Sequence, residues 1–203
     1  SIVTLILSDV VGDPLDAIAS GPTVAPVRNA MTAGQILEKY DLVEKIPSGA
    51  RKCLLEEKIP EEIPRSGCIG KAKRTVENIM IRNNTSAVQA AFTAAEQQGF
   101  KPHIMDTRLQ GEASDIGWKL GSFLREETIR RGDVHDTSCW IYGGETTVTI
   151  HGRGKGGRNQ ELALSAARAI AGLPNVAILS IATDGEDGPT DAAGAYVTGA
   201  TWD

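Results

Sequence analysis

Apolar residues fall into short runs that alternate with groups at helical spacing along most of the chain. Continuous apolar or β-branched runs predict strands at 2–7, 76–81, 102–106, 139–142, 146–150, 176–182 and 195–198. Apolar positions three and four residues apart predict helices at 30–40, 48–57, 84–98, 114–131 and 159–171. Because strands and helices mostly alternate, the pattern predicts an α/β fold.

The pattern also predicts several local features. The run 2–7 is apolar at every position but one, which favours a buried strand of a parallel sheet. Gly117 and Gly121 lie one turn apart and predict close packing of their helix against a neighbour. Residues 58–73 hold two prolines and two glycines and are the predicted linker. The chain starts without Met directly before a strand and stops just after another, so we expect a piece cut at both ends from a longer protein.

A glycine-rich basic segment, Gly152 to Glu161, leads into the predicted helix at 159–171. Its four glycines let backbone N–H groups turn toward a ligand, and a helix N-terminus favours an anion. Three cations add positive charge, so the segment predicts a site for phosphate or carboxylate. The candidate ligand residues are Lys155, Gly156, Gly157, Arg158, Asn159 and Gln160.

Two other readings of this segment stay open. It matches Gly-x-Gly-x-x-Gly, the dinucleotide fingerprint, but the acidic residue expected about 20 positions later falls near Ala177. A flexible connection into the helix is the second alternative. No Gly-Lys-Ser/Thr follows the glycines, so the segment is not a Walker loop.

Polar loops follow two of the predicted strands. Ser8, Asp9 and Asp13 come after 2–7, where a carboxylate can accept a proton from a substrate hydroxyl or help to hold a metal. The loop 183–194 carries four carboxylates, which could bind Mg²⁺ or Ca²⁺, although the EF-hand spacing fails. Turn hydrogen bonds and a solvated acidic loop are the plain alternatives. The candidates in the second loop are Asp184, Gly185, Asp187 and Asp191, with Asp184 and Asp187 as metal ligands.

Two further loops are weaker candidates. Gly144 and Glu145 lie in a predicted tight turn between strands, and Glu145 either points into a site or caps the turn. Ser20 and Gly21 lie in a loop whose hydroxyl groups could contact a ligand.

Charge and cysteine content narrow the function classes. The net charge of −5 argues against a nucleic-acid binder held by bulk electrostatics. No apolar run reaches the roughly 20 residues that a membrane helix needs. The three cysteines form no Cys-x-x-Cys pair, which favours reduced thiols and a cytoplasmic protein.

Taken together, these segments resemble the class II glycerate kinase (glycerate 2-kinase) family, whose C-terminal part is called the MOFRL domain. The matching blocks are Leu7-Ser8-Asp9-Val10-Val11-Gly12-Asp13 with Ile18-Ala19-Ser20-Gly21-Pro22, Gly143-Gly144-Glu145-Thr146, Gly156-Gly157-Arg158-Asn159-Gln160-Glu161-Leu162-Ala163-Leu164, and Thr183-Asp184-Gly185 with Asp187-Gly188-Pro189-Thr190-Asp191-Ala192-Ala193-Gly194.

The resemblance implies ATP-dependent phosphorylation of D-glycerate to 2-phosphoglycerate, with Mg²⁺. It implies an active site between a Rossmann-like domain and a second α/β domain with a mixed sheet. Residues 1–70 would be the C-terminal part of the first domain, with a remnant of its parallel sheet, and 71–203 a second, MOFRL-like domain that is incomplete at its C-terminus. The family's catalytic Asp and Arg map to Asp9 and Arg158. The expected partners are D-glycerate, a nucleotide and, in a homodimer, a second copy, with no nucleic acid or membrane.

Parts of the family pattern are absent. They are the N-terminal Gly-Lys-Ala-Ala segment with the catalytic lysine, the Ser-Gly-Gly-Gly-Ser-Ser loop, and the Asn-Asp-Ser and Thr-Gly-Thr-Asn stretches. We therefore expect this chain alone to be inactive. An NAD(P)-dependent oxidoreductase and a non-catalytic ligand-binding module are the alternative functions.

Overall fold

The computed structural model of the chain describes residues 1–24, 31–55, 76–132 and 137–202. The chain divides into two compact units. Unit 1 comprises Ser1–Leu7 and Asp13–Ile81, and unit 2 comprises Ser8–Gly12 and Arg82–Asp203. The linker predicted at 58–73 lies outside the described residues.

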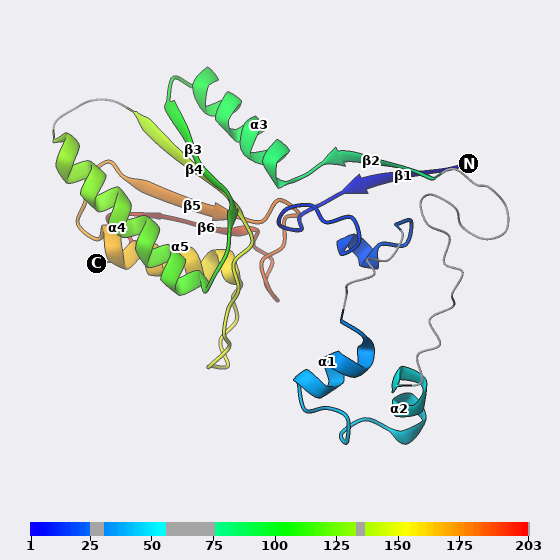
Figure 1. Cartoon of the computed structure of the whole chain (residues 1–203). Coiled ribbons are helices and arrows are strands. Elements are labelled where there is room, and N and C mark those ends of the chain that lie inside the picture. The colour runs from blue at the N-terminus through cyan, green and yellow to red at the C-terminus, as the bar shows by residue number, and fades with distance from the viewer. Residues whose placement is uncertain (25–30, 56–75, 133–136, 203) are drawn as a thin grey trace. The chain divides into compact units, whose positions relative to one another are not determined.

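Unit 1 holds a two-stranded sheet and short helices. Strands β1 (Ile2–Leu7) and β2 (Val76–Arg82) pair and run in the same direction (Figure 1). The helices are η1 (Ile18–Ser20), α1 (Ala33–Lys39) and α2 (Ser48–Leu55). A capping box begins α1, because the Thr32 hydroxyl accepts from the N–H of Gln35 while the Gln35 side chain accepts from the N–H of Thr32.

The prediction that the first strand is buried on both faces is wrong in this structure. Ile6 is buried, but Val3, Leu5 and Leu7, on the other face, are exposed. Among the described residues the strand has one neighbour, β2, and nothing described in unit 1 shields that face from solvent.

The described residues of unit 2 form four strands and three helices. They are α3 (Asn84–Gln97), β3 (Lys101–Leu109), α4 (Ala113–Arg131), β4 (Ser138–Gly144), α5 (Arg158–Ile170), β5 (Ala177–Ile181) and β6 (Gly194–Thr198). Strands β3 and β4 pair in parallel, whereas β5 and β6 pair antiparallel. The predicted α/β class is confirmed. Among the described residues, no helix has the length and apolar character needed to cross a bilayer.

Helix α5 is the centre of unit 2. It packs against α4 and against β5 and β6, while α3 packs on β3 and β4 (Figure 1). Its buried residues are Leu162, Ala163, Ala166, Ala167, Ala169 and Ile170. Ala163, Ala167 and Ile170 form one core cluster with Val197 of β6. Leu162 belongs to a second cluster, with Ala113 and Ile116 of α4.

The close packing predicted from Gly117 and Gly121 is confirmed. A methyl group on Gly117 would overlap the carbonyl oxygen of Leu162, and one on Gly121 would lie 2.6 Å from the Cβ of Ala169. Arg125, one turn further along α4, donates from Nε to the Ala169 carbonyl and from Nη2 to the Ala171 carbonyl, both at 2.6 Å. The guanidinium therefore satisfies carbonyl groups at the C-terminal end of α5, where positive charge is favourable.

Several local predictions are wrong. Residues 146–150 form no strand, because Thr147 pairs only with Gly111–Ala113 and the N–H of Thr149 donates to the Glu112 carboxylate. Gly143 and Gly144 end β4 rather than forming a turn between two strands. The helix predicted at 84–98 forms as α3; its N-cap is Asn83, whose side chain accepts from the N–H of Ser86, and the Asn84 side chain donates to the Thr107 carbonyl.

We expect Gly117→Ala to lower the free energy of unfolding by about 2 kcal/mol or more, because the added methyl group forces α4 away from the backbone of α5. Urea unfolding followed by circular dichroism measures this loss. Gly49→Ala is the matched control, since Gly49 lies in α2 with nothing within 4 Å of the position of a Cβ. The control should be neutral or slightly stabilising, and equal losses in both variants would contradict the packing argument.

Candidate functional site

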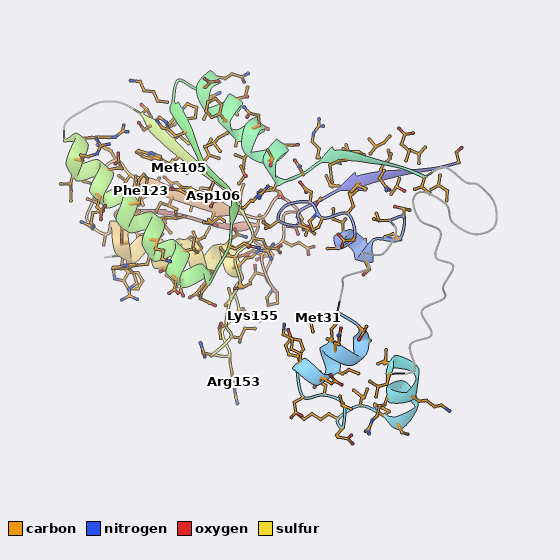
Figure 2. The ribbon with its side chains drawn as sticks, in the orientation of Figure 1. Met31, Met105, Asp106, Phe123, Arg153 and Lys155 are labelled. Carbon is orange, nitrogen blue, oxygen red and sulfur yellow. The ribbon has the colours of Figure 1, made fainter. Side chains whose placement is uncertain are left out.

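The predicted glycine-rich segment spans the end of a long loop, residues 145–157 between β4 and α5, and the first turn of α5. The loop projects from the body of unit 2, and Arg153 and Lys155 lie toward its far end (Figures 1 and 2). Both side chains are exposed. Nothing lies within 4 Å of the Cβ position at Gly154 or Gly156. Packing within the described residues therefore does not demand glycine at either position, which leaves their backbone open to close approach by a ligand.

Asp187 occupies the N-terminus of α5. One carboxylate oxygen accepts from the Asn159 N–H at 3.0 Å, and the other accepts from the Gln160 N–H at 2.9 Å. The side-chain amides of Asn159 and Gln160 each donate to the same carboxylate at 3.1 Å. Asp187 is 1% exposed, so a buried negative charge of the chain itself takes the two helix amides that the sequence suggests for a ligand.

The two amide side chains are further engaged inside unit 2. The Asn159 Oδ1 accepts from the Ser180 hydroxyl at 2.7 Å, which ties the helix start to β5. The Gln160 Nε2 donates to the Thr190 hydroxyl at 2.9 Å, and that hydroxyl donates to the Asp187 carbonyl at 2.8 Å. Asn159, Gln160 and Asp187, all candidate ligand contacts by sequence, thus satisfy one another.

Two glycines allow the acidic loop and the basic loop to meet. A Cβ on Gly157 would overlap the Asp187 side chain, and a Cβ on Gly188 would overlap the carbonyl oxygen of Gly156. Gly188 also has a φ of +63°, which a side chain rarely adopts. Of the glycines around the basic segment, Gly157 therefore has a packing role that Gly154 and Gly156 lack.

The Arg158 side chain lies next to Glu145 rather than in this network. Its Nη2 lies 3.5 Å from a carboxylate oxygen of Glu145, and the two side chains are 38% and 42% exposed. Glu145 is placed by its N–H, which donates to the Leu109 carbonyl at 2.9 Å. Exposed ion pairs of this kind are weak, so the guanidinium remains available to an anionic ligand.

The base of the loop is held by a residue that the sequence analysis did not single out. The Glu112 carboxylate accepts from the Thr149 N–H at 2.9 Å and from the Thr149 hydroxyl at 2.8 Å. These hydrogen bonds, with the backbone bond first in importance, lower the pKa of Glu112. The sequence does not single out Ser180 either, because a lone hydroxyl in a strand carries no motif, and Thr190 lies in a block that matches the family without being a candidate there.

The remaining candidates lie in loops of both units. In unit 2, Ser8 is buried, its N–H donates to the Arg82 carbonyl at 3.1 Å, and its hydroxyl accepts from the Val10 N–H at 3.2 Å. Asp9 is exposed beside it. In unit 1, Asp13, Ser20 and Gly21 have φ values of 53°, 63° and 59°, conformations that are costly for residues other than glycine.

The acidic loop does not form a metal cage. Asp184, Gly185 and Asp191 are exposed, and the Asp184 carboxylate accepts from the Glu186 N–H at 3.1 Å. Asp187, the other predicted metal ligand, has both oxygens engaged at α5. No cluster of three or more His, Cys, Asp or Glu side chains suited to a metal ion occurs among the residues that the structure describes.

The hydrogen bonds around Asp187 determine its ionisation. Burial by itself raises the pKa of this carboxyl, but the backbone and side-chain donors of Asn159 and Gln160 outweigh burial and hold the pKa below its ordinary value. A lowered pKa in the folded state contributes stability that is complete above the ordinary Asp pKa, about 3.9, and is lost as the pH falls through the lowered value.

We therefore expect Asp187→Asn to cost about 2 kcal/mol of unfolding free energy near neutral pH, because an amide cannot accept from all four donors. This difference from the wild type should shrink below about pH 4, as the wild-type carboxyl takes up a proton. Urea unfolding followed by tryptophan fluorescence over a pH series measures it. A difference that persists unchanged at acid pH would show that the charge of Asp187 is not responsible.

Comparison with known proteins agrees with the family resemblance of the sequence. The model of the MOFRL family matches residues 138–203, and the model of a domain of unknown function (DUF4147) matches residues 1–55. The chain is 44% identical to the glycerate 2-kinase of Pyrococcus horikoshii and 38% identical to the D-glycerate 2-kinase of Thermotoga maritima, in each case over 98% of this chain and 45% of the relative. The glycerate kinase of Homo sapiens is 32% identical over 97% of this chain and 44% of its own length.

Solved structures give the same result. The crystal structure of the Thermotoga maritima glycerate kinase superposes with a TM-score of 0.74 at 38% identity, and a structure from Pyrococcus horikoshii superposes with a TM-score of 0.66 at 43% identity. Both cover 98% of this chain, which spans 45% of each solved chain. With matches at both ends of the chain, and relatives that align along nearly all of it, the chain is similar to a part of the glycerate kinases, and its residues 138–203 match the MOFRL family.

Proposed function

We propose that this chain supplies part of the active site of an ATP-dependent D-glycerate 2-kinase that forms 2-phosphoglycerate. The observation that carries the proposal is the partly exposed side chain of Arg158 at the start of α5, beside a loop with open glycines. The named activity of the relatives supports it. Because the chain spans about 45% of these relatives, the activity is proposed for the whole protein.

The roles of the residues follow from the demands of phosphoryl transfer, which needs positioning and charge neutralisation. Arg158 would bind the transferring phosphoryl group or the glycerate carboxylate, and a guanidinium suits either because it can donate two parallel hydrogen bonds. Lys155 and the N–H groups of Gly156 and Gly157 would add to this anion site. Asp9 would orient the attacking hydroxyl of glycerate and accept its proton.

The other predicted contacts are proposed as nucleotide or substrate contacts. They are Ser8, Asp13, Ser20, Gly21, Gly144, Glu145, Asp184, Gly185 and Asp191. Since the described residues form no cage for Mg²⁺, we propose that this ion arrives with the nucleotide phosphates, as is common for Mg²⁺. The proposed roles of Asp9 and Arg158 do not depend on it.

Two alternatives have no support among the described residues. For an NAD(P) oxidoreductase, the glycine fingerprint should join a strand directly to a helix, but here it lies in a loop that leaves β4 at residue 145. A purely non-catalytic module has no observation in its favour. A cytoplasmic location and a homodimer remain predictions.

We expect Arg158→Ala, in the protein expressed from its complete gene, to lower kcat by about 10²- to 10³-fold. The lost guanidinium no longer neutralises charge that develops in the transition state. A coupled assay of ADP release with D-glycerate measures the effect.

Arg168→Ala is the control. Arg168 is an exposed arginine ten residues further along the same helix, where its guanidinium lies over the ring of Trp202. The kcat of Arg168→Ala should match that of the wild type. Near-normal turnover of Arg158→Ala would refute the assignment.

A further inference from the structure

An N-terminal helix turn that faces an external anion normally keeps its first amides for that anion. In this chain the amides of Asn159 and Gln160 are both taken by Asp187, a residue 27 or 28 positions further along the chain. An external phosphate therefore cannot use them while Asp187 is in place. What a ligand can reach at this point is the side chain of Arg158 and the loop that precedes it.

We propose that Asp187 is a positioning residue for Arg158: its buried carboxylate fills the anion position of α5 and holds the first helical turn so that the Arg158 guanidinium faces the ligand side. This inference deepens the proposed function, and it rests on that function only for the identity of the ligand. It assigns Asp187 an indirect role in place of the direct contact with metal or nucleotide that the sequence suggests.

The first turn of α5 is held from two directions. Asn159 and Gln160 donate four hydrogen bonds to the Asp187 carboxylate, and the Asn159 side chain accepts one from the Ser180 hydroxyl of β5. Arg158 directly precedes these two residues, and Gly157, the N-cap, directly precedes Arg158. Because Gly157 packs against Asp187 itself, the backbone of Arg158 is fixed on both sides by the same carboxylate.

Glu145, the ion-pair partner of Arg158, has a fixed backbone position. The backbone of Glu145 is pinned to Leu109, so the 3.5 Å approach between Glu145 and Arg158 depends mainly on where α5 begins. Release of Asp187 would free the helix start and change this approach. The Glu145–Arg158 pair is thus an internal reporter of the position of Arg158 without any ligand.

A role in stability alone is the competing explanation, and the chain offers a matched control for it. Arg125 of α4 caps the C-terminal end of α5, where it donates two hydrogen bonds of 2.6 Å to backbone carbonyl groups. Arg125→Gln removes a charged cap from the same helix but leaves the Arg158 end untouched. Thr190→Val is a milder variant at the Asp187 end, because it removes only a hydroxyl that accepts from Gln160 and donates to the Asp187 carbonyl, and it keeps the Asp187 carboxylate.

The first experiment uses the full chain without ligand and follows the Nε–Hε signal of Arg158 by NMR, assigned by its loss in Arg158→Lys. We expect Asp187→Asn to shift or broaden this signal, Thr190→Val to move it less in the same direction, and Arg125→Gln to leave it unchanged. Melting temperatures are measured for all variants, so that comparisons are made at matched stability. If Asp187→Asn does not fold, the comparison of Thr190→Val with Arg125→Gln decides the question.

The second experiment titrates the same variants with inorganic phosphate and with ATP. If Arg158 keeps its competent position only about a tenth of the time in Asp187→Asn, the apparent affinity falls about tenfold. Arg125→Gln should bind as the wild type does.

The outcomes separate the two proposals. An Arg158 signal that is unchanged in both Asp187→Asn and Thr190→Val, or equally changed in Arg125→Gln, overturns the positioning role, whatever the ligand proves to be. A shifted signal in a chain whose wild type binds neither phosphate nor ATP supports the positioning role and counts against the proposed function.

Discussion

The contact between the Asp187 carboxylate and the first turn of α5 is the interaction on which unit 2 depends most. It joins an acidic loop to the helix that carries most of the core, and both carboxylate oxygens are fully used. A buried charge is costly unless hydrogen bonds and a favourable dipole offset the loss of water. Here four donors and the positive end of a helix do so together.

The same interaction explains why the two loops that carry most of the motif residues meet. Gly157 and Gly188 let the backbones come into direct contact, and the side chains of Asn159 and Gln160 fill the remaining hydrogen bonds. A polar network of this kind is stable only when every member has its partner. Arg158 stands outside it, and so the first turn of α5, whose Asn159 and Gln160 side chains are engaged within the chain, leaves one cation at the edge of the network beside the exposed Arg153 and Lys155 of the preceding loop.

The sequence predicts much of this fold because its signals are local. Helical spacing located α4 and α5 within one or two residues, and Gly117 with Gly121 predicted the close helix contact. The failures concern partners that are distant in the chain. Whether 146–150 forms a strand depends on a neighbouring strand, and its hydrogen bonds go instead to Gly111 and Glu112. Likewise, the composition of the acidic loop suggests a metal site, but only the fold shows that Asp187 faces a helix terminus.

The two charged caps of α5 also bear on the order in which the protein can fold. A helix of 13 residues is marginal by itself in water. One cap of α5, Asp187, is made after the helix during synthesis, and the other, Arg125, is made well before it. Helix α5 therefore gains its full stability only when chain segments on both sides of it in the sequence have packed against it. This central helix of unit 2 is then among the last elements to become stable.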